Sequence, residues 1–423
     1  MKKSHVVVYS ALLLLLGSVC SQAQQSLAST RNGDSNAGSQ SVSNVSGTGT
    51  QRTLPQCSGQ ASRLPGSIAG PCKPVLAGTQ AQQLSNDHSR HDDGAIYVEF
   101  VVPGSTCEAS FPLCTTPVAI NLFGAVTGSY ADTNASLHGF VRDPWGTITT
   151  FDGPGATCPN YFSICTWPVG INLQAAITGY YCDAVTCHGF LRTPGGTIVG
   201  FDPPGSVLTA FNTGGINLAG VITASYYDAN FVEHGFLRAP GGTFTSFEAP
   251  GAVNGTSPTG INDAGGIVGT YFDANDAAHG FLRAPDGTIT TFDPTGSTYT
   301  TASAINLEGA ITGSWQDASG MTHGFRRSRY GTLTTFDVPG SMDQTVPSAI
   351  DPAGTITGSF YTSGGLHGFV RASDGTFTTF DPPGSEEPSS LTIADGINPA
   401  GVITGWYIDP SFIGHGFLRI PIL

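Results

Sequence analysis

The chain repeats one pattern of short apolar segments separated by polar turns. Its fourth copy reads Gly260-Ile261-Asn262, then Ile267 to Asp273, His279 to Arg283 and Thr288 to Asp293. β-branched and aromatic residues fill these segments, and Asn-x-x-Gly, a polar loop and Pro-Asp-Gly separate them. The pattern predicts four short strands in about 45 residues, which is the size of one propeller blade.

The third predicted strand carries a fixed motif, His-Gly-Phe, then Leu, Val or Arg, then Arg. It recurs at intervals of 44–50 residues, so we number seven repeats. The motif starts at His138, His188, His234, His279, His323, His367 and His415.

The two ends of the chain complete each other. The seventh repeat stops after the third strand, and Tyr97 to Gly104 matches the missing fourth strand. We therefore predict an all-β fold, a seven-bladed β-propeller of four-stranded blades, closed by an N-terminal strand completing the last blade. Closure removes the sheet edges that an open array exposes. A β-solenoid is the alternative, and it would not need an N-terminal strand to complete the last repeat.

If the N-terminal strand is outermost, Ala/Gly-Ile-Asn is the innermost strand of each blade. The loops after Pro-Gly and the Asp-to-His loops then share one end, which we call the variable face because loop length varies there. The Asn-x-x-Gly and Pro-x-Gly turns share the other end, which we call the turn face. Function is expected on the variable face, since binding residues concentrate on loops.

The first 93 residues differ in composition from the repeats. Lys2 and Lys3 precede an apolar run, and Ser21-Gln22-Ala23 offers a cleavage site, so 1–23 reads as a signal peptide. A lipid anchor on Cys20 is the alternative. Residues 24–93, rich in Ser, Gly and Gln, read as a flexible linker, and 94–423 as the propeller. We expect a secreted or periplasmic protein.

The net charge of −14 and the three lysines of the chain restrict its partners. A nucleic-acid-binding protein needs a clustered basic face, so we expect no nucleic-acid partner. No segment after the signal is long and apolar enough to span a membrane. We expect a monomer.

The seven histidines favour a structural interpretation over a catalytic one. In strands, residues two apart share a side, and a hairpin brings Asp273 near His279. We expect a buried Asp–His pair in every repeat but the sixth, where Thr362 replaces the aspartate, with the motif arginine free to bond a carboxylate or carbonyl. A catalytic site would need one copy, not seven.

Two further repeated positions are also expected to be structural. The aromatic residues of the second strand are assigned to the core between blades: Tyr130, Tyr181, Tyr226, Tyr271, Trp315, Phe360 and Tyr407. The residues that open the inner turns are assigned to bonding nearby backbone: Asn121, Asn172, Asn217, Asn262, Asn306, Asp351 and Asn398. Each glycine after the motif histidine is expected to leave room for an aromatic neighbour.

The cysteines break the repeat. Eight remain after the signal, which favours disulfides in an exported chain. The candidate pairs are Cys107–Cys114, Cys158–Cys165, Cys182–Cys187 and Cys57–Cys72. The stapled loops carry Phe111, Tyr161, Phe162 and Trp167, which we take as candidate ligand-binding residues; loop stabilisation is the alternative. The cysteine spacing does not suit zinc, no calcium-loop pattern is present, and we expect no cofactor or metal.

The repeat resembles the bacterial extracellular HAF repeat family, named for His-Ala-Phe. The matching residues are Gly-Ile-Asn-x-x-Gly-x-Ile-x-Gly at 260–269 and His-x-Phe-Leu at 279–282, over about Tyr97 to Arg419. The chain departs from it with Gly after the histidine and Arg where Trp is usual. The resemblance implies export and a propeller-like array, and no activity.

The function that these features favour is a secreted, non-enzymatic propeller binding a polysaccharide or protein through its disulfide-stapled variable face. We assign no catalytic residue. One alternative is a secreted polysaccharide lyase or glycoside hydrolase with a site at the axial funnel, where Glu233, Asp276, Glu386 and Glu387 are candidate carboxylates. A purely structural module of the cell exterior is the other.

Overall fold

The computed structural model describes residues 94–106, 114–157, 164–209, 213–385 and 390–422, all within the compact unit Asp87–Leu423. All the secondary-structure elements assigned in these ranges are β-strands. No helix within them is long and apolar enough to cross a membrane.

Each repeat contributes strands at four positions, counted outward from the inner edge. The inner strands are β2 (Thr115–Ile120), β6 (Thr166–Ile171), β10 (Gly215–Ile216), β14 (Gly255–Ile261), β18 (Tyr299–Ile305), β22 (Thr345–Ile350) and β26 (Ser390–Ile397). The second strands are β3 (Val126–Ala131), β7 (Ile177–Cys182), β11 (Ile222–Tyr227), β15 (Ile267–Phe272), β19 (Ile311–Gln316), β23 (Ile356–Thr362) and β27 (Ile403–Ile408).

The third strands carry the His-Gly-Phe motif, and the fourth strands lie outermost. The third are β4 (Leu137–Arg142), β8 (Cys187–Arg192), β12 (Glu233–Arg238), β16 (Ala278–Arg283), β20 (Thr322–Arg327), β24 (Gly365–Arg371) and β28 (Gly414–Pro421). The fourth are β5 (Ile148–Phe151), β9 (Ile198–Phe201), β13 (Phe244–Phe247), β17 (Ile289–Phe292), β21 (Leu333–Phe336), β25 (Phe377–Phe380) and, from the N-terminal side, β1 (Ala95–Phe100).

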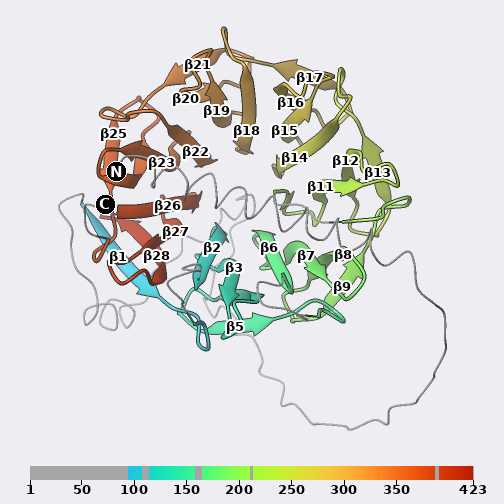
Figure 1. The fold of residues 1–423 in the computed structure, drawn as a ribbon, viewed down its shortest axis with the longest axis horizontal. Helices are drawn as coiled ribbons and strands as arrows, with labels where there is room; N and C mark the ends of the chain where they lie inside the picture. The colour runs from blue at the N-terminus through green and yellow to red at the C-terminus, as the bar shows by residue number, and fades with distance from the viewer. Residues whose placement is uncertain (1–93, 107–113, 158–163, 210–212, 386–389, 423) are drawn as a thin grey trace, which may run out of the picture. The chain divides into compact units, whose positions relative to one another are not determined.

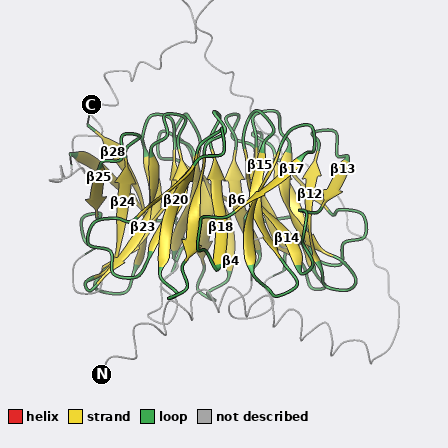
Figure 2. Ribbon diagram, turned by 90° about the horizontal axis from the view of Figure 1, so that it is seen from above, coloured by secondary structure: helices red, strands yellow, loops and turns green. Residues whose placement is uncertain are grey.

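The strands form repeated antiparallel four-stranded sheets (Figure 1). Five repeats form separate sheets, and a short parallel pairing of β24 with β26 joins the last two into one sheet of eight strands. β1 pairs with β28 from Ala95–Pro421 to Phe100–Gly416, so the N-terminal strand stands beside the last one. Side on, the loops lie at the two ends of the strands, which are the variable and turn faces (Figure 2).

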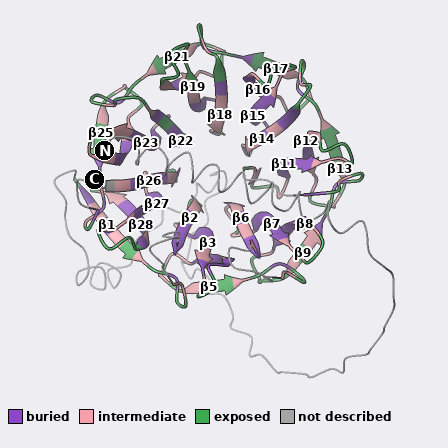
Figure 3. Cartoon of the chain, in the orientation of Figure 1, coloured by how far each residue is buried: buried purple, intermediate pink, exposed green. Residues whose placement is uncertain are grey.

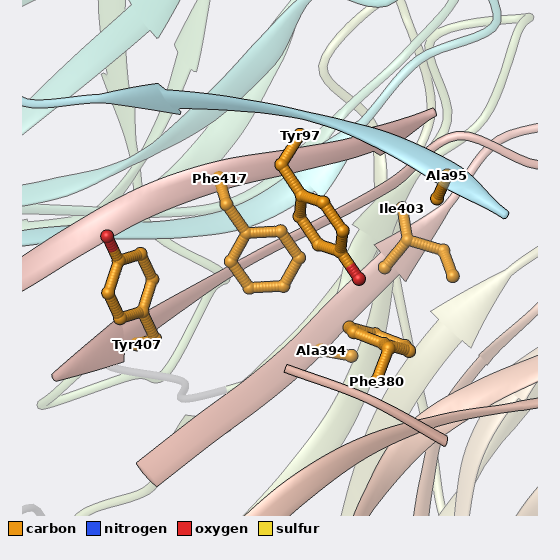
Figure 4. Close-up of a cluster of buried hydrophobic side chains, with 7 residues drawn as sticks. All are labelled: Ala95, Tyr97, Phe380, Ala394, Ile403, Tyr407 and Phe417. Atoms are coloured by element: carbon orange, nitrogen blue, oxygen red, sulfur yellow. The ribbon is translucent and has the colours of Figure 1, made fainter. Parts of the chain in front are cut away.

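The core lies between neighbouring sheets, and the fourth strands are the more exposed ones (Figure 3). The motif phenylalanine is fully buried in every repeat, as in Phe140 and Phe417. It packs edge to face on the fourth-strand phenylalanine of the preceding repeat, with ring centroids 5.9–6.4 Å apart. For Phe140 that partner is Phe100 of β1. Tyr97 of β1 likewise packs beside Phe417 (Figure 4).

Glycines set the spacing of the strands. A Cβ on Gly139, after His138, would overlap the ring of Phe151, and the same holds in the other six repeats. The expected room for an aromatic neighbour is therefore present, and the fourth-strand phenylalanine fills it. The glycine of the second strand, such as Gly313, lies against the carbonyl of Thr301 in the inner strand.

The inner turns link neighbouring repeats through their amides. Asn121 Oδ1 accepts the backbone N–H groups of Phe123 and Ala125, which confirms the expected turn role. Its Nδ2 also donates to the carbonyl of Asn172 in the next repeat, which the sequence analysis missed. Such links of 2.9–3.3 Å run from repeat to repeat, and Asn398 donates back to the carbonyl of Asn121.

One link of this amide ring cannot form, because the side chain of Asp351 has no N–H group to donate. Asp351 is buried, and its Oδ1 accepts the N–H of Thr355. We expect Asp351→Asn to add the missing bond to the carbonyl of Asn398 and to raise the free energy of unfolding by about 1 kcal/mol. Urea unfolding measures this, with the exposed Asp374→Asn as the control. An unchanged or lower stability for Asp351→Asn alone would contradict the role given to the ring.

Candidate functional site

Each repeat holds its histidine at the variable face. His138 Nε2 lies 3.5 Å from Asp132 Oδ2, which is the predicted hairpin pair. The pair recurs at 3.3–3.7 Å in repeats two to five and seven. In repeat six Thr362 Oγ1 replaces the carboxylate, 3.0 Å from His367 Nε2.

A second carboxylate, which the sequence analysis missed, binds the other ring nitrogen. His138 Nδ1 lies 2.9 Å from Asp152, the acid that ends the fourth strand. Asp202, Glu248, Asp293, Asp337, Asp381 and Glu99 take this place in the other repeats, at 2.5–3.0 Å. The bond to Asp152 raises the pKa of His138, and the bond to Glu99 of β1 raises the pKa of His415.

These histidines are less buried than predicted, with side chains 9–28 % exposed. Each ring packs on the aromatic residue opposite it in the second strand, as His279 does on Tyr271 with centroids 5.0 Å apart. Those aromatic residues are mostly buried, as expected. Because every repeat holds this arrangement, it fastens one strand to the next rather than forming a single site.

The motif arginines pack on aromatic rings, which the sequence did not predict, and the expected carbonyl partner is present for Arg142, Arg192 and Arg283. Each lies over the fourth-strand phenylalanine of the preceding repeat, 4.8–5.2 Å from the ring centroid. Arg142 also reaches the carbonyl of Asp143, at 3.3 Å. Burial lowers the pKa of Arg142 and of Arg192. The arginines therefore bind neighbouring repeats together near the turn face.

One of the four predicted disulfides lies wholly within the described residues and is present there. Cys182 and Cys187 form a disulfide across β7 and β8, and Cys114 and Cys165 are each disulfide-bonded. Cys57, Cys72, Cys107 and Cys158 lie outside the described residues.

The predicted ligand-binding aromatic residues are largely outside the described residues, as Phe111, Tyr161 and Phe162 are. Trp167 lies in the inner strand β6, opposite Tyr180, and is half-buried rather than carried on a loop. Within the described ranges, no group of three or more His, Cys, Asp or Glu side chains could hold a metal ion.

Positions that differ from the repeat consensus are more informative about function than the consensus itself, and several of them lie in repeat three. Ala224 stands where the other second strands have glycine, and it is fully buried. Gly214 packs against its Cβ, and β10 is only two residues long. Leu208, which bridges to Tyr227, and Gly215 correspond to Tyr299 and Ala304 of repeat five. The segment from Leu208 to Gly215 is two residues longer than the one from Tyr299 to Ala304. Repeat three thus differs from the other repeats both in its second strand and in the length of chain before β10.

Glu233 is another position at which repeat three differs from the other repeats. It is the only acidic residue directly before a motif histidine, at the start of β12. Ser225 Oγ donates to Glu233 Oε1 at 2.5 Å, and Ser257 of repeat four also bonds this carboxyl. Burial raises the pKa of Glu233. Gly255 packs on its Cβ, where any side chain would clash.

Two exposed apolar residues stand two positions before Glu233 and two positions before Gly255, the glycine that packs on it. Phe231 is two residues before Glu233 and 48 % exposed, with a φ of 59° that bulky residues rarely adopt. Val253 is two residues before Gly255 and 57 % exposed. We call Ser225, Phe231, Glu233, Val253 and Ser257 the Glu233 cluster.

Of the other carboxylates named for an enzymatic site, Asp276 is the one within the described residues. Asp276 Oδ1 accepts the amide of Asn254 at 2.6 Å, and Glu386 and Glu387 lie outside the described residues. The sequence signals for the cluster were Ala224 in place of glycine and an acid before the motif histidine.

Comparison with known proteins identifies the fold. No family model and no curated protein matches the chain. A streptogramin B lyase structure superposes with a TM-score of 0.50 at 14 % identity, over 76 % of this chain and 96 % of that one. The β-propeller domain of the Trilobed protease from Pyrococcus furiosus gives 0.51 at 9 % identity, over 72 % and 92 %. The chain has a β-propeller fold. At these identities the likeness carries no function.

Proposed function

We propose that the chain is an exported, closed seven-bladed propeller of the HAF-repeat type that binds a polysaccharide through its variable face. Pairing of β1 with β28, contact of β2 with β26 and the bond from Asn398 to Asn121 support closure. Disulfide-bonded cysteines support export, because such bonds persist in oxidising compartments.

The Glu233 cluster carries the binding proposal. It combines a carboxyl and two serine hydroxyls with the exposed ring of Phe231. Sugar rings present hydroxyls and apolar faces together, and binding sites match them with a few polar groups beside apolar side chains. The repeated histidines and arginines are engaged in holding strands and repeats together, so they do not compete as a binding site.

A second candidate function is glycoside cleavage. A general acid needs a raised pKa, which burial gives Glu233, and a second carboxylate, Glu248, lies close enough to contribute to that shift. Glu248 is, however, engaged by His234 and by Thr256. This favours binding over catalysis.

Thermal unfolding of the full chain with soluble oligosaccharides tests the proposal. A ligand that binds only the folded state raises the midpoint. We expect one glycan class to do so, and Phe231→Ala to abolish the shift. Phe412→Ala is the matched control, because Phe412 is 55 % exposed at the same hairpin position of repeat seven, with a φ of 64°.

The same samples separate the alternatives. Cleaved oligosaccharide that disappears with Glu233→Gln would favour the enzyme. If no glycan shifts the midpoint, polysaccharide binding is wrong, and a protein partner or a purely structural role takes its place.

A further inference from the structure

The charged side chains of the described residues divide between the two faces. All nine arginines of the described residues lie near the ends of third strands or in the turns that follow, at the turn face. The lysines of the chain are Lys2, Lys3 and Lys73, outside the described residues. Within those residues, the variable face thus has histidine as its only basic side chain.

Carboxylates outnumber the histidines on the variable face. Thirteen acidic residues pair with the seven motif histidines: six from the hairpins, six that directly follow a fourth strand, and Glu99 within β1. Even with every histidine protonated, this ring keeps a negative charge. It therefore attracts cations and repels anionic polymers.

Glu233 stands apart from these pairs. Its hydrogen-bond partners are the neutral hydroxyls of Ser225 and Ser257. A carboxyl shielded from water ionises reluctantly. The charge of His234 favours the ionised form of Glu233, and a ligand cation placed beside the carboxyl favours it further. The exposed ring of Phe231, two residues away, can add a cation–π contact to the same ligand.

We propose that the Glu233 cluster selects amino sugars, so that the ligand is a glycan bearing free ammonium groups. This rests on the proposed glycan-binding function and names its ligand class. The ligand ammonium lies against the Glu233 carboxylate, Ser225 and Ser257 hold that carboxylate in place, and Phe231 packs on the sugar ring.

Two tetrasaccharides that differ in acetylation test this directly. Titration calorimetry of the full chain at about pH 6 compares β-1,4-linked glucosamine with β-1,4-linked N-acetylglucosamine of equal length. We expect glucosamine to bind at least about tenfold more tightly, and added salt to reduce that difference, because salt screens charge–charge attraction.

Two variants distinguish the effect of the Glu233 carboxyl on ligand preference from the effect of the negative charge of the whole variable face. Glu233→Gln keeps the shape of the side chain and removes its charge, so we expect it to abolish the preference for glucosamine. Asp343→Asn is the matched control, since Asp343 is an exposed acid of the same face between repeats five and six. It should change the preference by less than about twofold, because salt screens the charge of an exposed side chain. If Glu233→Gln does not fold, Phe231→Ala serves instead and should weaken both sugars.

The outcomes decide between the two proposals. Equal binding of both tetrasaccharides, tighter binding of the acetylated one, or a preference that survives Glu233→Gln overturns the amino-sugar inference and leaves glycan binding standing. Binding of another glycan class alone does the same. No binding by any glycan overturns both.

Discussion

Replacing Asp395 by serine should stabilise the protein at pH 8 by several kcal/mol. Asp395 is the bulged residue of β26, between Ala394 and Gly396. The same position holds Ser303 and Ser348 in repeats five and six and Thr259 in repeat four. Thr259 donates its hydroxyl to the carbonyl of Ala302 in the next repeat. An ionised carboxylate has no proton to donate there.

The environment of Asp395 disfavours its charge. The residue keeps part of its surface exposed, but Oδ2 is buried without a hydrogen-bond partner, and burial raises its pKa to about 8. An acid with a raised folded-state pKa destabilises the fold progressively as pH rises from its unfolded pKa, about 3.9, to the folded one. At about 1.4 kcal/mol per pH unit, the full effect at pH 8 is about 5 kcal/mol.

Thermal unfolding from pH 4 to pH 8 measures the effect. We expect the midpoint of Asp395→Ser to exceed that of the wild type by several degrees at pH 8, and the difference to disappear near pH 4. Asp343→Ser, which removes an exposed acid, controls for net charge. A gain that is the same at both pH values would show that burial of charge is not the cause.

Adding one methyl group at Gly313 should destabilise the protein by about 3 kcal/mol. Its Cβ would overlap the carbonyl oxygen of Thr301 and press on Ala302 Cα. Both are backbone atoms of the inner strand β18, so no side chain can rotate away. Repeat three has alanine at this position, Ala224, together with two additional residues between Leu208 and Gly215, and repeat five has no such insertion.

Urea unfolding of Gly313→Ala gives the change in the free energy of unfolding. Gly241→Ala is the control, because nothing lies within 4 Å of a Cβ there and its φ is not in the positive range. We expect the control to change stability by less than about 0.5 kcal/mol. A stable Gly313→Ala protein would mean that the inner strand can move without help from an insertion.

The sequence predicted the strands well because the local pattern determines them. Alternating apolar residues and turn glycines mark each segment, and the Asp132–His138 pair follows from one hairpin. Asp152 was missed as a partner of His138 because its approach depends on the register of a neighbouring strand. The stacking of Arg142 on Phe100 was missed for a stronger reason: it joins two repeats, and their relative placement leaves no trace in the spacing of either one.

The Glu233 cluster could be predicted only in part. The acid before His234 and the alanine in the second strand are visible in the sequence as departures. The partners of Glu233 are not, since Ser225 and Ser257 belong to different repeats. Burial of the carboxyl depends on Gly255, whose lack of a side chain makes the space.

The amide links from inner turn to inner turn have a consequence for how the chain unfolds. Arrays of repeats joined only to their neighbours lose structure from their ends, one repeat at a time. Here Asn398 of the seventh repeat also donates to the carbonyl of Asn121 in the first, so unfolding from either end of the array must break this bond. We expect one cooperative transition, and we expect removal of any single repeat to disrupt the whole. New chain ends, by contrast, should be tolerated in any variable-face loop once the native ends are joined.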